Sequence, residues 1–317
     1  MLQVIISPAK QMRAAQDAFE VLGITPFARE TARLHRALLD IERNEGSGGL
    51  QALWNVSDKL LTTCLDTLHE FMPVLSDASL ADPDIARRIS PAVMSYHGIQ
   101  YQSMAPEVMD AAQLDWLQNH LWILSGLYGC VRPFHAVEPY RLEMGAKLAV
   151  DNARDLYAFW GDKLARAIAP AGSNATIVNL ASAEYAKAVL PRLTTEATVV
   201  TCLFGEGIRN GKPIQRSTAS KKARGSMVRW MAENKLEVEA EMKQWKQQDE
   251  DVLTYALFPQ VAKEFFESRP AKKPPVEKRE ILKAAAPEVK KAPVSTEEMD
   301  GNGINTWAGR KSESYQI

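Results

Sequence analysis

Four segments of this sequence are rich in hydroxyl, basic or aromatic side chains, and three of them also contain glycine, a mixture that packing alone does not require. They are the stretches 6–10 (ISPAK), 124–133 (LSGLYGCVRP) with its continuation 139–145 (PYRLEMG), 155–163 (DLYAFWGDK) and 221–225 (KKARG). Hydroxyl and cationic groups suit phosphate oxygens, and glycine lets a backbone approach a ligand closely. Phosphate recognition is therefore the first chemistry that these residues indicate.

The stretch Ser125–Arg132 has the outline of a helix-hairpin-helix motif. Leucines at helical spacing predict a helix over Ala112–Leu124, and Gly126 and Gly129 then form a tight loop before a second expected helix. In such a motif the loop N–H groups and a helix N-terminus meet a DNA phosphate, which positions the duplex without reading its bases. The same spacing also fits an ordinary pair of helices in which the glycines provide a C-cap and a turn.

A compact basic cluster consists of Lys221, Lys222 and Arg224. Between Gly205 and Trp230 the sequence has seven basic residues and a single acid, and hydroxyl side chains precede the cluster. Such a cluster suits a phosphodiester backbone or a small phosphorylated ligand. The alternative is a solvated face with no ligand.

Several common sites are absent from the sequence. The five histidines show no HxxxH or HxH spacing, and Cys64, Cys130 and Cys202 are too far apart for a CxxC metal site. The P-loop, the dinucleotide-binding glycine fingerprint and the G-x-S-x-G elbow do not occur. Asp155 and Asp162 offer oxygen ligands, but their seven-residue spacing gives little support for an iron site. We therefore expect no metal and no cofactor.

The elements that would position these residues form a mixture of strands and helices. Short apolar runs rich in β-branched residues predict strands at 2–6, 175–180 and 197–204. Apolar residues at helical spacing predict helices at 31–43, 58–72, 112–124, 182–190 and 226–245. Glycines at 44–49 predict a break, and Ser57 is an expected N-cap. The mixture predicts an α/β or mixed α+β fold, without the regular βαβ alternation of a doubly wound sheet.

The overall composition is that of a folded protein in a reducing compartment. The chain of 317 residues is 46% apolar and 24% charged, with a formal net charge of −1. No apolar run is long enough to span a membrane, and the N-terminal run does not fit a signal peptide. We expect a cytoplasmic protein with one globular domain over 1–262. The Lys/Pro/Glu-rich stretch 263–317 is expected to be a mostly disordered tail.

Seven short blocks, in the same order along about four-fifths of the chain, make this sequence similar to the YaaA family of bacterial peroxide stress resistance proteins. They are ISPAK at 6–10, SDKL at 57–60, LSGLYG-x-x-RP at 124–133, PYRLEMG at 139–145, DLY-x-FWGD at 155–162, NLAS-x-EY at 179–185 and KKARG at 221–225. The resemblance implies a single compact domain of unusual mixed α/β fold, with a helix-hairpin-helix element and a positively charged cleft. It also implies binding of double-stranded or branched DNA.

The resemblance further implies a role in limiting DNA damage under hydrogen peroxide, partly by keeping unincorporated iron low. It implies no established enzymatic activity and no obligate protein partner. The loop residues Ser125, Gly126 and Gly129 would belong to the hairpin. Basic residues that match positions suited to line the cleft are Lys10, Arg132, Arg141, Lys221, Lys222 and Arg224. One departure is the small polar stretch 217–220, where the family usually carries an aromatic residue.

An alternative function is an enzyme that acts on a nucleotide or another phosphorylated small molecule. Ser7 and Lys10 follow a strand, and Glu143, Asp162 and Glu184 are possible acids or bases. A duplex needs a broad basic surface, whereas a metabolite needs a closed pocket of roughly 300–1,000 Å³. A third possibility is an interaction scaffold that uses the tail.

Overall fold

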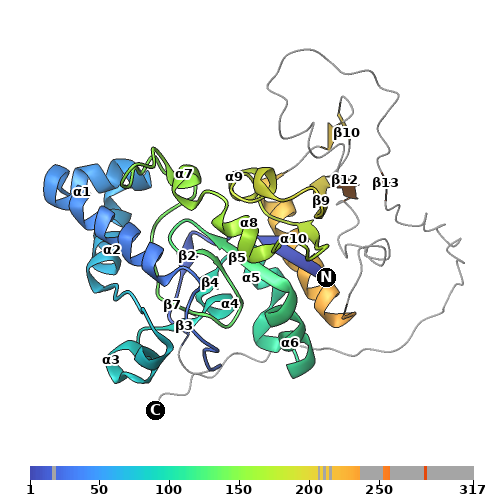
Figure 1. The fold of residues 1–317 in the computed structure, drawn as a ribbon, viewed down its shortest axis with the longest axis horizontal. Helices are drawn as coiled ribbons and strands as arrows, with labels where there is room; N and C mark the ends of the chain where they lie inside the picture. Colours follow the sequence, from blue (N-terminus) through green and yellow to red (C-terminus); the bar gives the residue numbers. More distant parts are fainter. Residues whose placement is uncertain are drawn as a thin grey trace, which may run out of the picture. The chain divides into compact units, whose positions relative to one another are not determined.

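Figure 1 shows the chain as a computed structural model, which describes residues 1–15, 19–205, 208–209, 212–213, 216–235, 253–257 and 282–283. All of these residues belong to one compact unit, Met1–Ala285. The expected domain boundary at 262/263 lies outside the described residues, and so does the expected tail apart from Leu282–Lys283. In the part of the chain that is described, no helix has both the length and the apolar character needed to cross a bilayer.

A seven-stranded sheet in the order β13-β12-β9-β8-β1-β5-β6 forms the centre of the fold. Its strands are β1 (Leu2–Ile6), β5 (Leu121–Ser125), β6 (Gly129–Val131), β8 (Thr176–Asn179), β9 (Thr198–Gly205), β12 (Leu253–Leu257) and β13 (Leu282–Lys283). Strands β9, β8, β1 and β5 run parallel, and β6 and β12 add antiparallel neighbours. All residues of β1 and β5 are buried, as is typical of strands covered on both faces. The expected strands at 2–6, 175–180 and 197–204 are confirmed.

The order of the four parallel strands contains a reversal. From β1 the chain crosses to β5 on one side, and then returns past β1 to β8 and β9 on the other side. This places a topological switch point between β1 and β8, as in doubly wound α/β sheets. The expected mixed α/β fold is confirmed, whereas this reversal in strand order was not among the predictions from the sequence. The connections 7–120 and 126–175 contain many short elements, and they hide the βαβ alternation in the sequence.

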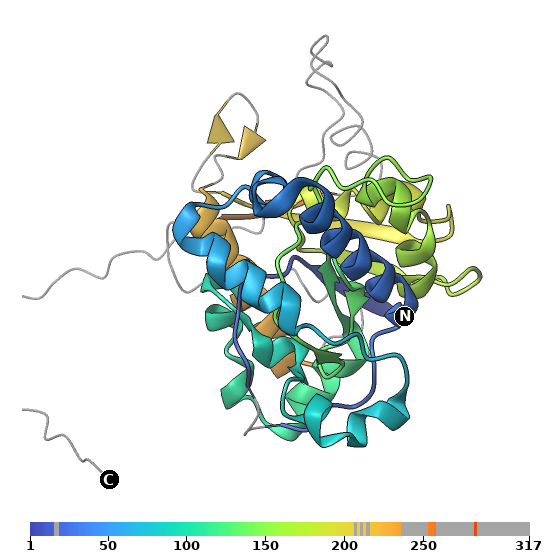
Figure 2. The same cartoon turned by 90° about the vertical axis from the view of Figure 1, so that its left-hand side faces the viewer.

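Two long helices near the N-terminus pack against each other. They are α1 (Ala28–Trp54) and α2 (Asp58–Glu70), and Figure 2 shows both in front of the sheet. The expected break at 44–49 is a kink inside α1, where Gly46 has φ 71°. Ser57 is the N-cap of α2, as expected, and α2 ends before Pro73.

The remaining elements are short, apart from the helices α6 and α10. The other α-helices are α3 (Pro83–Ala86), α4 (Ala92–Ser95), α5 (Ile99–Met104), α6 (Ala111–His120), α7 (Leu156–Trp160), α8 (Lys163–Ile168), α9 (Ala183–Ala186) and α10 (Ser217–Glu233). Single 3₁₀ turns span Asp77–Ala81, Pro106–Val108 and Leu190–Arg192. Three two-stranded ribbons pair β2 (Gln11–Met12) with β4 (Tyr96–His97), β3 (Ser90–Pro91) with β7 (Ala136–Val137), and β10 (Ile208–Arg209) with β11 (Lys212–Pro213).

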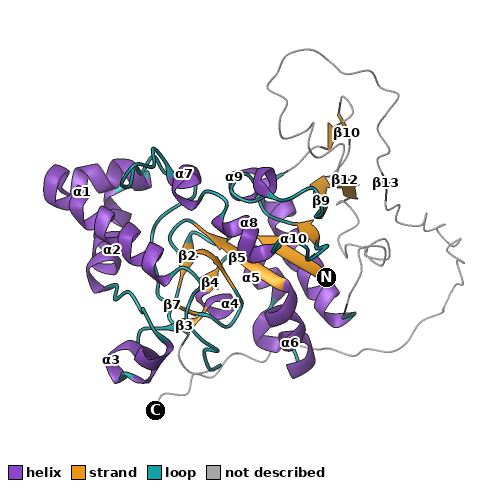
Figure 3. Ribbon diagram, viewed as in Figure 1, coloured by secondary structure: helices purple, strands orange, loops and turns teal. Residues whose placement is uncertain are grey.

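The segment expected to be a helix-hairpin-helix is a β-hairpin. Helix α6 ends at His120, and the next five residues enter the sheet as β5 (Figure 3). Strand β5 pairs with β6 from Ile123↔Val131 to Ser125↔Gly129. Leucines 114, 117, 121 and 124 keep helical spacing across this boundary, so the pattern alone extended the predicted helix into a strand. The expected position of this motif at Ser125–Arg132 is therefore corrected.

Helix α10 begins earlier than expected and contains the basic cluster. The predicted helix at 226–245 starts at Ser217, and residues 236–245 lie outside the described part of the chain. Helix α10 packs closely on α5 at Gly225, where a Cβ atom would collide with the carbonyl oxygen of Gln100. This contact holds the middle of α10 beside α5.

Candidate functional site

The carboxyl ends of the parallel strands meet at one edge of the sheet, and serines from three of these strands, or from the loops that follow them, lie there. Ser7 follows β1, Ser125 ends β5, and Ser182 follows β8. In open α/β sheets, ligands bind outside this edge, at the switch point. We call this region the carboxyl edge.

Ser7 and Ser182 close the switch point between β1 and β8. The backbone N–H of Ser182 donates to Ser7 Oγ at 2.8 Å, and Ser7 Oγ donates to Ser182 Oγ at 3.1 Å. The carbonyl oxygen of Ser7 accepts hydrogen bonds from Gln100 Nε2 at 2.8 Å and from the Tyr101 hydroxyl at 3.0 Å. Helix α5 therefore covers the loop that follows β1.

A chain of hydroxyl groups follows β5 into the core. Ser125 Oγ lies 2.7 Å from the Tyr140 hydroxyl, which lies 3.1 Å from the Tyr96 hydroxyl, and the backbone N–H of Tyr128 donates to Ser125 Oγ. Burial raises the pKa of Tyr140 to about 12 and raises that of Tyr96 as well. These phenols are therefore neutral, and Ser125, which is fully buried, serves the packing of the hairpin.

An ion-pair cluster joins Lys10 to the loop that contains Arg141. Glu143 Oε1 accepts from Lys10 Nζ at 2.9 Å and from Arg141 Nη2 at 3.0 Å. The Lys10 side chain is 65% exposed, whereas that of Arg141 is only 15% exposed. Both predicted cations thus share one carboxylate, which reduces the charge that they offer to an anion.

Glu184 connects three of the sequence blocks. Its Oε1 accepts from the backbone N–H of Gly145 at 2.7 Å, and its carbonyl oxygen accepts from the Tyr157 hydroxyl at 3.1 Å. Lys187 Nζ lies 4.5 Å from the centre of the Tyr157 ring. The possible acid Glu184 is therefore engaged in holding the loop after Arg141 against α7 and α9.

The basic cluster on α10 divides into exposed and buried members. Lys221 and Lys222 are exposed, whereas Arg224 is mostly buried beside Cys202, and burial lowers the pKa of its guanidinium. Ser220 Oγ donates to the carbonyl oxygen of Phe204 at 3.1 Å and ties α10 to β9. The two lysines are thus the members of the cluster that are open to a large ligand.

The remaining hairpin residues have packing roles. Arg132 lies 3.8 Å over the ring of Trp122 and donates to the carbonyl oxygens of Asn119 and Leu121 at 2.9 Å and 3.3 Å. Gly126 and Gly129 are buried, and a Cβ atom at Gly129 would approach Trp160 and Leu164 to 2.8 Å. Gly129 also has φ 75°, which favours glycine in the hairpin turn.

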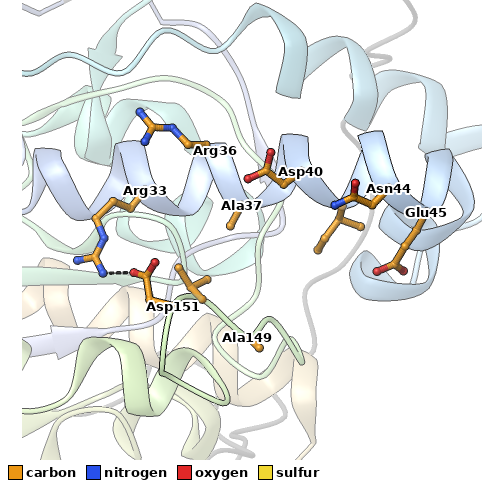
Figure 4. A pocket seen from close by; sticks show the side chains of 10 residues that line it. Arg33, Arg36, Ala37, Asp40, Asn44, Glu45, Ala149 and Asp151 are labelled. Carbon is orange, nitrogen blue, oxygen red and sulfur yellow. Dashed lines mark hydrogen bonds and ion pairs between the residues drawn. The ribbon is translucent and has the colours of Figure 1, made fainter.

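A separate polar hollow lies between α1 and the loop at Ala149–Asp151 (Figure 4). Its volume is 310 Å³, and Arg33, Arg36, Asp40, Glu45 and Asp151 contribute its charged groups. Arg33 forms an ion pair with Asp151. None of the residues that line this hollow is one of the predicted site residues. Sequence reasoning thus did not find this hollow, because the charges alternate in sign and show no motif.

Sequence reasoning also missed Ser182 and Gln100 as partners of Ser7. Ser182 belongs to the block NLAS-x-EY at 179–185, so its place directly after a predicted strand was the available signal. Gln100 has no such signal, because its role depends on a contact with a residue 93 positions away.

Comparison with known proteins places these features in a family. The family model described as "Peroxide stress protein YaaA" matches residues 2–255. A UPF0246 protein of Pediococcus pentosaceus is 40% identical over 255 residues, which cover 80% of this chain and 92% of that protein. A UPF0246 protein of Lacticaseibacillus casei is 41% identical over 242 residues, covering 76% of this chain and 90% of that protein.

Proposed function

This chain belongs to the family of peroxide stress protein YaaA, and from that premise we propose that it binds DNA through the exposed basic face of α10. The contacts would be made to phosphates and not to base edges. Bound in this way, the protein would act on double-stranded or branched DNA during peroxide stress without selecting a sequence.

The observation that carries this proposal is the charge of α10. From Arg216 to Glu233 the chain has five basic residues and one acid, Glu233, which pairs with Arg229 at 2.7 Å, and the first turn of the helix has no acidic side chain. Lys221 and Lys222 are exposed, and they lie in the second turn of a helix of 17 residues, directly after the first turn, where the helix dipole favours anions. Evenly spaced phosphates are the polyanion that such a surface suits best.

Fluorescence anisotropy of a labelled duplex and a labelled four-way junction, titrated at several salt concentrations, tests the proposal. The variant Lys221→Ala/Lys222→Ala removes two exposed cations. The matched control, Lys147→Ala/Arg154→Ala, removes two exposed cations from the loop before α7. If both lysines contact phosphates, the log–log salt slope should become shallower by about 1.8, at about 0.9 for each contact.

Two results would count against DNA binding at α10. The first is the absence of salt-sensitive binding of the wild-type protein to either DNA, which would contradict the proposal. Equal loss of affinity in the control and in the lysine variant would show that net charge, and not this helix, determines binding. Thermal unfolding of all three proteins checks that each is folded.

We further propose that the protein lowers unincorporated iron indirectly. Among the described residues, no three His, Cys, Asp or Glu side chains are grouped in a way that could hold a metal ion. Purified protein that retains stoichiometric ferrous iron after desalting would overturn this part of the proposal.

The carboxyl edge favours a second candidate function, an enzyme acting on a nucleotide or phosphorylated small molecule. The switch point between β1 and β8 is the usual ligand position in such a sheet, and Ser7, Lys10 and Glu143 lie near it. A screen of phosphorylated metabolites by thermal shift, with wild type and Lys10→Ala compared, tests this function. Stabilisation of wild type that the variant loses would support it.

A further inference from the structure

A small cavity lies between the helices α1 and α2 and the loop that carries Arg141. Its walls include Trp54 from α1, Cys64 and Thr67 from α2, and Tyr140 and Arg141. The cavity has a volume of about 10 Å³, which is close to the smallest space that holds one water-sized molecule. There is thus room for about one additional oxygen atom.

Two hydrogen-bond donors on the walls of this cavity have no acceptor. Trp54 is only 3% exposed, and its indole Nε1 is buried without an acceptor among the described residues. The same holds for Nε of Arg141, although the Nη groups of Arg141 bond Glu143 and the carbonyl oxygen of Lys10. A buried donor without a partner costs about 1–3 kcal/mol, so this site is suited to an oxygen acceptor.

Cys64 differs from the other two cysteines in its exposure. Cys130 and Cys202 are fully or almost fully buried at 0% and 3% exposure, whereas Cys64 is partly exposed and also lines the cavity. Of the three cysteines, Cys64 is therefore the most accessible to a small oxidant in solution. Oxidation would place a new oxygen on the side chain of a residue that lines the same cavity as both donors.

We propose that Cys64 is the residue of this chain that hydrogen peroxide oxidises, and that the cavity accommodates the oxygen of the sulfenic acid that forms. In this step the thiolate sulfur attacks one peroxide oxygen, an S–O bond forms and the O–O bond breaks. The departing hydroxide takes a proton and leaves as water. The sulfur is oxidised by two electrons and the peroxide is reduced. The N–H groups of Trp54 and Arg141 then donate to the new oxygen.

The resting sulfur is a thiol. Burial raises the pKa of Cys64, and the positive charge of Arg141 opposes that rise only in part. The other titratable groups on the cavity wall are His35, whose Nε2 lies 2.9 Å from the carbonyl oxygen of Leu68, and Tyr140, whose phenol is neutral. Because the thiolate is the nucleophile, oxidation should accelerate as the pH rises from 7 to 9, by up to about tenfold per pH unit.

The test is to treat the full chain with hydrogen peroxide in the presence of a 1,3-dione that traps sulfenic acids, and to quantify the adduct at each cysteine by mass spectrometry. We expect adduct at Cys64, at least about tenfold above that at Cys130 and Cys202, which are internal controls for burial. Trp54→Phe keeps the ring but removes the N–H donor. It should lower the yield about fivefold, which corresponds to the loss of one hydrogen bond. Trp116→Phe removes an indole N–H elsewhere and should leave the yield unchanged.

Three results would overturn the proposal. The first is an unlabelled Cys64 in folded protein while a urea-unfolded sample labels at that position. The second is labelling of Cys130 or Cys202 as fast as Cys64, and the third is a rate that does not rise with pH. The Cys130 and Cys202 comparison is made within wild type, so it holds even if a variant does not fold. Because this readout is independent of DNA affinity, its failure leaves the DNA-binding proposal in place.

Discussion

Ser7 and Ser182, which are 175 positions apart in the sequence, are joined by two hydrogen bonds across the switch point of the sheet. Ser7 Oγ accepts the backbone N–H of Ser182 and donates to its hydroxyl. Inside the parallel ladder a backbone carbonyl would accept such an N–H. At the point where β1 and β8 have ended, the Ser7 hydroxyl accepts it instead. The pair holds together the first block of the family pattern, at 6–10, and the block at 179–185, which extends into α9.

The variant Ser7→Ala should destabilise the protein by about 1–2 kcal/mol, because the partly buried N–H of Ser182 loses its acceptor. The matched variant Ser182→Ala keeps that N–H bonded to Ser7 Oγ and loses only the contact between the hydroxyls. It should cost about 0.5–1.5 kcal/mol. Urea unfolding followed by circular dichroism measures both values. Equal costs for the two variants would show that the backbone bond contributes nothing.

The strands could be predicted where local pattern and environment agree. β1, β8 and β9 are short β-branched runs closed by turns, and all three were predicted. β5 was not, because LWILS follows a true helix without a break and its leucines continue the helical spacing. Ladder partners on both sides determine its conformation, and those partners are distant in sequence. The site could not be predicted for the same reason. Whether the guanidinium of Arg132 is accessible to a ligand depends on its tertiary contact with Trp122.

The contact between α10 and α5 predicts that Gly225→Ala is strongly unfavourable. A Cβ atom at this position would collide with the backbone carbonyl of Gln100, and a backbone atom cannot move aside as a side chain can. We expect a loss of about 1–3 kcal/mol in the free energy of unfolding. Gly48→Ala is the matched control, because Gly48 lies in α1 with no atom within 4 Å of the added Cβ. The control should gain about 0.5–1 kcal/mol. A neutral Gly225→Ala would mean that the two helices are farther apart.

A substitution of Arg132 can distinguish a structural role of this residue from a direct contact with DNA. Its guanidinium stacks on Trp122 and donates to two carbonyl oxygens, and burial lowers its pKa to about 10. Arg132→Met should therefore lower the free energy of unfolding by about 1–3 kcal/mol, through the unpaired carbonyls and the lost stacking. It should leave the salt slope of DNA binding unchanged. Anisotropy and urea unfolding on the same sample test both parts, and a shallower salt slope would place Arg132 in the DNA interface after all.

Glu138 and His135 lie on one segment and should give the stability opposite dependences on pH. Burial raises the pKa of the Glu138 carboxyl to about 7, even though it accepts the N–H of Met72 and lies near Arg88. Between its unfolded pKa of about 4.5 and 7, the folded state binds more protons than the unfolded state, so stability falls as pH rises. Burial and the charge of Arg132 lower the pKa of His135 to about 4, consistent with Nδ1 accepting the backbone N–H of Arg132. Between about 4 and 6.5 the unfolded state binds more protons through this residue, so stability rises with pH.

The two contributions should largely cancel in wild type between about pH 4.5 and 6.5, and single variants should reveal them. In Glu138→Gln only the His135 contribution remains, so the free energy of unfolding should increase with pH across this window. In His135→Gln only the Glu138 contribution remains, and the free energy should decrease. Each slope approaches about 1.4 kcal/mol per pH unit in the middle of the window, because one proton is exchanged. Urea unfolding of the three proteins at half-unit pH steps measures these slopes, and parallel curves for wild type and both variants would show that neither group titrates as its burial requires.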